Sequence, residues 1–61
     1  MTRFVLEVDL TALPAETRAA ELGRILRYWG GAMKQVPLAP GERQDLSDSG
    51  YVVVGSWRIE D

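Results

Sequence analysis

One segment, residues 14–34, makes up about a third of this 61-residue chain and most constrains what it can fold into. Its apolar residues recur at spacings of three and four, which places them in one stripe along a helix. The stripe consists of Ala15, Ala19, Leu22, Leu26, Trp29 and Met33, and Ile25 widens it on one side. Pro14 suits the first turn of a helix, because a proline there loses no hydrogen bond. The spacing predicts an amphipathic helix that begins at about residue 14.

Two adjacent glycines near the end of this segment raise the question of where the helix stops. Trp29 and Met33 stay in phase only if the helix continues, and Gly30 and Gly31 then lie on its solvent side at a cost of about 1 kcal/mol each relative to Ala. Alternatively, one glycine ends the helix in the left-handed conformation, or the pair lets another backbone approach closely. The phase favours a helix that runs through to about Lys34.

Strand patterns flank the helix on both sides. Residues 3–10 alternate with a period of two, as in a half-buried strand. Their apolar face holds Phe4, Leu6, Val8 and Leu10. Residues 51–59 are rich in β-branched and aromatic side chains, which strands favour. One face of this second segment holds Tyr51, Val53, Trp57 and Ile59, and the other holds Val52 and Val54. We expect it to form the central strand.

The segment between the helix and the last strand contains two turn signals. Pro40 and Gly41 fit the central positions of a type II turn, and residues 47–50 predict a second turn. Because a long stretch without structure is unusual in so small a chain, we expect a short strand at about Arg43–Leu46. The result is a single α+β domain over residues 1–61, with the order β-α-β-β and one long helix on one face of a small antiparallel sheet. The alternative is a plain β-α-β unit whose two long strands are parallel.

The residue content excludes several kinds of site. The chain has no Cys and no His, so disulfides, structural zinc, haem ligation and imidazole acid–base catalysis are excluded. A domain of this size buries only about 60% of the surface that its unfolded chain exposes. Good packing or association with another chain must therefore supply its stability. We assign no cofactor and no metal site.

Net charge and hydropathy limit the kinds of partner and the compartment that we expect for this protein. Seven Lys and Arg residues against nine Asp and Glu residues give a net charge of −2, which argues against a uniformly basic nucleic-acid binder. The longest apolar runs, residues 4–6 and 51–54, are far too short for a signal-peptide core or a membrane span. We expect a cytoplasmic protein.

Three valines form the candidate interface. If the helix covers the Phe4 face of the sheet, Val5, Val52 and Val54 lie on the face that a single helix cannot cover. An exposed apolar patch often marks an interface, although three valines on an open sheet face can also be ordinary surface. The pattern favours a homodimer or another protein partner. A first strand at the edge of the sheet offers a second route, edge-to-edge pairing across a two-fold axis.

The outer side of the helix is a second candidate site. Arg24, Arg27 and Lys34 project there beside Tyr28, which makes a basic strip that could meet phosphate or an acidic partner. Three positive charges are weak evidence for a phosphate-binding surface, and a solvent-exposed helix face with extended arginine side chains is the simpler interpretation.

The sequence predicts no enzyme. Glu7 and Asp9 alternate onto one face of the first strand and could in principle act as an acid–base pair. Carboxylates at that spacing usually face solvent, and no glycine-rich phosphate loop or nucleophile motif accompanies them. We assign no catalytic residue.

Two short motifs carry a resemblance. "LRYWGGAMK" at residues 26–34 and "VGSWRIED" at residues 54–61 resemble a group of short uncharacterised proteins encoded by actinobacteria and their phages. The resemblance covers most of the chain and implies a small accessory or regulatory protein. The sequence as a whole predicts a non-enzymatic protein-interaction module that acts as a homodimer. The alternative is a nucleic-acid-associated regulator that uses the basic helix face.

Overall fold

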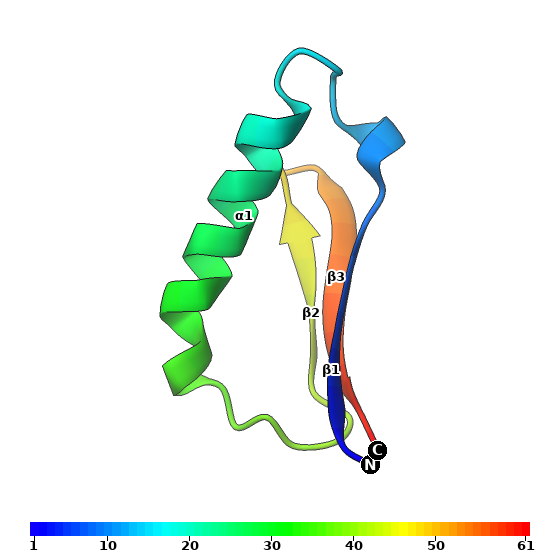
Figure 1. Ribbon diagram of the computed structural model, residues 1–61, viewed down its shortest axis with the longest axis vertical. Coiled ribbons are helices and arrows are strands. Elements are labelled where there is room, and N and C mark those ends of the chain that lie inside the picture. The colour runs from blue at the N-terminus through cyan, green and yellow to red at the C-terminus, as the bar shows by residue number, and fades with distance from the viewer.

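The fold has four main elements in the predicted order, β-α-β-β. A computed structural model describes residues 1–61. The elements are β1 (Arg3–Val8), α1 (Arg18–Ala32), β2 (Arg43–Ser47) and β3 (Val53–Glu60), and two short 3₁₀ helices, η1 (Leu10–Ala12) and η2 (Met33–Gln35), follow β1 and α1. Figure 1 shows α1 lying along one side of the three strands.

The three strands form one antiparallel sheet in the order β1-β3-β2. The predicted central position of the last strand is confirmed. The alternative of a plain β-α-β unit is wrong, because β1 and β3 are antiparallel, with Arg3 opposite Glu60. This pairing brings the two ends of the chain together (Figure 1), where the Thr2 hydroxyl donates a hydrogen bond to the Asp61 carboxylate at 3.3 Å.

The helix begins later than predicted. α1 starts at Arg18, and Pro14 instead opens a turn that the Thr17 N–H closes by donating to the Pro14 carbonyl at 3.1 Å. Leu13, just before this turn, is buried in the core, so the chain must change direction after it before α1 can cover the sheet. The Arg18 guanidinium donates to the Leu13 carbonyl at 3.2 Å and ties the turn to the helix start.

The two glycines do not end the helix. α1 continues through Gly30 and Gly31 to Ala32, and η2 extends it as a 3₁₀ turn. Apart from the neighbouring residues and the backbone of the helix itself, no atom lies within 4 Å of where a Cβ on either glycine would be. The prediction of a through-running helix is confirmed, and both glycines face solvent.

The buried face of α1 is centred on Ile25. Ile25 is 2% exposed, whereas Leu26, which the sequence placed in the stripe, is 48% exposed. The predicted stripe is therefore rotated toward Ile25, because α1 lies along the β2 side of the sheet. The core consists of Leu13, Ile25, Leu46, Val54, Trp57 and Ile59, with Leu6, Val8, Trp29, Met33 and Val36 packed against it.

Four aromatic rings cross the domain in sequence. Phe4 of β1 lies 5.6 Å from Trp57 of β3, centroid to centroid, and Trp57 meets Trp29 of α1 at 5.5 Å in an edge-to-face arrangement. Tyr28 then contacts Trp29 edge-to-face at 5.1 Å. Such pairs contribute about 0.5–1.5 kcal/mol beyond their buried area. The rings join the sheet to the helix from the β1 edge to the surface of α1.

A β-bulge shifts the faces at the start of β3. Leu46 lies opposite Gly55, but Ser47 lies opposite Val53, so Val54 is an extra residue without a partner on β2. Because side chains alternate along a strand, one extra residue exchanges the faces of the residues before it. Val54 is 4% exposed and Val53 is 56% exposed. The predicted placement of Val53 on the core face is wrong for this reason. Tyr51 is not on the core face either, because β3 begins only at Val53 and Tyr51 lies in the turn before it.

Both predicted turns are present, and the second lies one residue later than predicted, at Asp48–Tyr51, where the Tyr51 N–H donates to the Asp48 carbonyl at 3.0 Å. Gly41 has a φ of +96°, and the Glu42 N–H donates to the Ala39 carbonyl at 3.1 Å, as a type II turn with Pro40 and Gly41 in the centre requires. The short strand predicted at Arg43–Leu46 is β2.

The first strand is shorter than predicted. β1 ends at Val8, because the Asp9 carboxylate accepts hydrogen bonds from the Thr11 N–H and hydroxyl and begins η1, which includes Leu10.

Candidate functional site

The sheet face opposite α1 is covered by charged side chains. Arg58 forms ion pairs with Glu7 and, at 2.6 Å, with Glu60, while Arg3 binds Glu60 at 2.8 Å. The hydrogen bonds from Arg58, followed by those from Arg3, lower the pKa of the Glu60 carboxyl, and Glu60 and Glu7 raise the pKa of Arg58. Partly exposed ion pairs contribute little stability singly. They make this face polar rather than apolar.

The three predicted interface valines do not form a patch. Val54 lies in the core, because the bulge turns it toward α1, so its assignment to the open face is wrong. Val52 is 59% exposed but precedes β3, in a turn where it exchanges hydrogen bonds with Asp48. Val5 is half-buried on the open face, opposite Arg58.

One edge of the sheet is open along β1. The Asp9 N–H donates to the Val54 carbonyl at 2.8 Å. Hydrogen-bonded and non-bonded pairs alternate along antiparallel strands, so residues 3, 5, 7 and 9 direct their backbone groups to β3. Phe4, Leu6 and Val8 therefore direct their N–H and C=O groups away from the sheet.

The side chains of β1 leave this edge accessible. Phe4 is 45% exposed, although it packs on Trp57, because α1 does not cover the outer side of β1. β1 contains no proline, glycine or bulge that would obstruct pairing with another strand. Its two charged residues, Arg3 and Glu7, have opposite signs and side chains that are 60% and 63% exposed.

The other edge, along β2, is covered at its C-terminal end. The Arg24 guanidinium donates to the outward Ser47 carbonyl at 2.7 Å and to the Glu21 carboxylate at 3.0 Å. Glu21 also accepts hydrogen bonds from the Ser49 N–H and hydroxyl, and Ser49, followed by Arg24, lowers the pKa of Glu21. Together with the bulge, this Arg24–Glu21 clip prevents strand addition at the end of β2.

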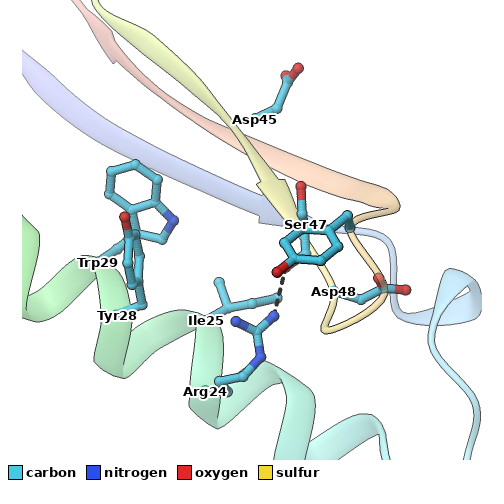
Figure 2. Close-up of a pocket in the computed structure, with 8 residues that line it drawn as sticks. Arg24, Ile25, Tyr28, Trp29, Asp45, Ser47 and Asp48 are labelled. Atoms are coloured by element: carbon cyan, nitrogen blue, oxygen red, sulfur yellow. Dashed lines mark hydrogen bonds between the residues drawn. The ribbon is translucent and has the colours of Figure 1, made fainter.

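A groove of about 300 Å³ lies between α1 and the end of β2, and Tyr28, Trp29, Arg24 and Tyr51 contribute to its lining. Figure 2 shows Arg24 reaching from α1 to Ser47, while Asp45 on β2 points away from the helix. Tyr51 is 90% exposed and has a φ of 65°, a left-handed conformation that costs a non-glycine residue about 1 kcal/mol or more. The groove has an aromatic wall, and its charged lining residues are the paired Arg24 and two aspartates, Asp45 and Asp48.

The predicted basic strip is only partly present. Arg27 and Lys34 are exposed, and Tyr28 is 63% exposed at the lip of the groove. Arg24 is engaged with Ser47 and Glu21, so its charge is already paired. The four residues do not act as one cationic surface.

Glu7 and Asp9 are occupied separately. Glu7 pairs with Arg58, whereas Asp9 lies beyond β1 and bonds Thr11, which lowers its pKa. The structure does not bring these two carboxylates together as a pair.

No known protein family, characterised protein or solved structure matches this chain. The structure contains no group of three or more Asp or Glu side chains that could hold a metal ion. None of its helices combines the length and the apolar character needed to cross a membrane.

Sequence reasoning missed the clip that covers the end of β2. Its signal was weak, because Arg24 three residues after Glu21 is an ordinary pair on a helix surface. Only the fold brings Ser47 and Ser49 to that pair.

Proposed function

We propose that this protein is a non-enzymatic protein-interaction module, with a regulatory or accessory role, that acts as a homodimer joined through the β1 edge. The valine face that first suggested a dimer is replaced by this edge, since Val54 is buried and the open face is charged.

The inequality of the two sheet edges carries the proposal. An unpaired strand edge is a template for another strand, and proteins usually blunt such edges with bulges, charges or covering groups. Both edge strands carry charged side chains, Arg43 and Asp45 on β2 and Arg3 and Glu7 on β1, but only β2 is also covered by the Arg24 clip and lies beside the bulge in β3. β1 has a free edge with Phe4 half exposed beside it.

The rest of the molecule supports an accessory role. The dimer leaves the groove beside Tyr28 and Trp29 free, and aromatic side chains of this kind are common in surfaces that bind another protein. We place the protein in the cytoplasm. The resemblance to short proteins of actinobacteria and their phages agrees with a small regulatory partner rather than a self-sufficient enzyme.

The alternative function, nucleic-acid binding, has fewer free positive charges on α1 to support it than the sequence predicted. Arg27 and Lys34 remain available on α1, doubled in a dimer, while Arg24 is paired. Binding through phosphates weakens steeply with added salt. Tight binding to DNA or RNA at low salt that weakens steeply as salt is added would therefore favour the nucleic-acid function.

Sedimentation equilibrium over a wide concentration range tests the proposed homodimer. We expect the wild type to approach twice 6.8 kDa. Phe4→Lys should weaken the dimer by roughly tenfold or more, because it places a charge where an apolar side chain is buried on pairing. Leu26→Lys is the matched control, since Leu26 is 48% exposed against 45% for Phe4 but lies on α1.

A wild type that stays monomeric at the highest concentration refutes the dimer. Equal weakening by Phe4→Lys and Leu26→Lys would refute its assignment to the β1 edge. Far-ultraviolet circular dichroism of both variants confirms that the comparison is between folded proteins.

A further inference from the structure

We infer that two copies of this chain pair along β1 in one register, with Val5 on the two-fold axis and Arg3 opposite Glu7 of the second copy. This inference rests on the proposed homodimer and adds the surface chemistry that selects the partner. The product is a six-stranded antiparallel sheet with one helix from each copy on the same face.

The faces of the sheet limit the possible registers. In an antiparallel pair, residues directly opposite each other must point to the same face if both apolar faces are to stay with the helices. Two copies of β1 can therefore meet only with a residue on the axis, and Phe4, Val5 and Leu6 are the central choices.

Backbone geometry permits the Val5 register. It places Phe4 opposite Leu6 of the second copy, and both residues direct their N–H and C=O groups outward. They can exchange two hydrogen bonds on each side of the axis. Val5 then faces its own copy in a non-bonded pair, where side chains come closest.

Side-chain chemistry selects this register. On the open face, Arg3 lies between Glu60 of its own chain and Glu7 of the second copy, so the charges alternate across the junction. On the helix-facing side, Phe4 meets Leu6 of the second copy and continues the apolar row that Trp57 begins. Opposite-charge and apolar cross-strand pairs both stabilise a sheet.

The neighbouring registers lose the charge pair. With Leu6 on the axis, Glu7 faces Val5 of the second copy, and Arg3 faces Asp9, which lies beyond the strand. With Phe4 on the axis, Arg3 faces Val5. Only the Val5 register matches Arg3 with Glu7 on both sides of the two-fold axis.

Disulfide trapping reads the register directly, because the chain has no Cys of its own. Residues in a non-bonded antiparallel pair have Cα atoms about 4.5 Å apart, within the range that a disulfide spans. Val5→Cys should therefore form a covalent dimer under mild oxidation. Glu7→Cys is the control, since in this register the two copies of residue 7 lie about 13 Å apart along the strand.

A charge exchange gives an independent readout. Arg3→Glu and Glu7→Arg should each self-associate about tenfold or more weakly than the wild type, because two symmetric attractive pairs become repulsive. An equimolar mixture of the two variants should recover wild-type association as a heterodimer. Recovery on mixing separates this effect from loss of the internal Arg3–Glu60 and Arg58–Glu7 pairs, which mixing cannot restore, and circular dichroism confirms that each variant is folded.

The outcomes separate the register from the dimer. A dimeric wild type with Leu6→Cys crosslinking in place of Val5→Cys, or with no recovery in the charge mixture, overturns this register and leaves the homodimer intact. A monomeric wild type overturns both. Efficient crosslinking of Val5→Cys but not Glu7→Cys, with recovery in the mixture, establishes the inference.

Discussion

Gly55 is the position where one methyl group should be most damaging. It lies in β3 opposite Val8 of β1. A Cβ at this position would collide with the Glu7 carbonyl oxygen and come within 2.9 Å of the Val8 Cα. Both obstacles are backbone atoms, so no side-chain rotation can relieve the contact. Gly55→Ala must push β1 away from β3.

The cost can be worked from the contacts that move. Overpacking costs about 1–3 kcal/mol, and each ladder hydrogen bond that lengthens contributes about 0.5–1.5 kcal/mol. With the Asp9–Val54 bond and its neighbour affected, the loss is about 3 kcal/mol. A chain of 61 residues has a total stability of about 3–9 kcal/mol at typical values per residue. Gly55→Ala should therefore leave the domain marginally folded.

Urea unfolding followed by circular dichroism, at one fixed protein concentration, measures this loss. For an m-value of about 1 kcal/mol/M, the midpoint should fall by about 3 M. The same substitution at Gly30 provides the control, because that Cβ meets no atom apart from the neighbouring residues and the helix backbone, and Ala is the better helix former. Gly30→Ala should raise stability by about 1 kcal/mol. A midpoint for Gly55→Ala equal to that of the wild type would refute the close-approach argument.

Three further predictions address other parts of the fold. Tyr51→Gly should stabilise the domain by about 1 kcal/mol in urea unfolding, because it relieves a left-handed residue whose side chain is 90% exposed. Because the pKa of Glu21 is lowered in the folded protein, its contribution to stability is full above the usual carboxylate pKa and is lost as the pH falls through the lowered value. Glu21→Gln should therefore make the free energy of unfolding depend less on pH in the acid range, which thermal melts at several pH values will test. Ile25→Ala should cost about 2–5 kcal/mol and Leu26→Ala far less, and the reverse order would contradict the observed face of α1.

Local signals were sufficient for most of the fold. Alternation located β1, β-branched and aromatic side chains located β3, and Pro40 and Gly41 located their turn. The phase of Trp29 and Met33 predicted that the helix continues through its glycines. Each of these features depends on residues within a few positions of one another. The topology followed because short connections leave few ways to arrange one helix and three strands.

The errors arose where distant residues decide the outcome. The bulge at Val54 depends on how β3 meets β2, and no local pattern marks it. The bulge reverses the face to which the preceding strand residue points, and it places Val54, one of the three predicted interface valines, in the core. The helix starts at Arg18 and not at the predicted Pro14, because Leu13 is buried in a core to which residues far along the chain also contribute.

The candidate site was the least predictable part. Pairing of two copies through their sheet edges could be predicted from the sequence, because the predicted topology places β1 at one edge of the sheet. The covering of the β2 edge at its C-terminal end could not, since it requires Arg24 to reach Ser47 across 23 positions of sequence. The contrast between the two edges is a property of the folded molecule alone.

The pairing of residue 3 with residue 60 also sets the order in which this chain can fold. Their ion pair spans 57 positions, so β1 has no partner within the chain until β3 has been synthesised. α1 and the β2–β3 hairpin rely on nearer contacts and can form without β1. Docking of β1 therefore carries the largest loop-closure cost and should limit the folding rate. Until that step, the strand that ends as an open edge is unpaired on both sides, and it is then the segment most exposed to aggregation.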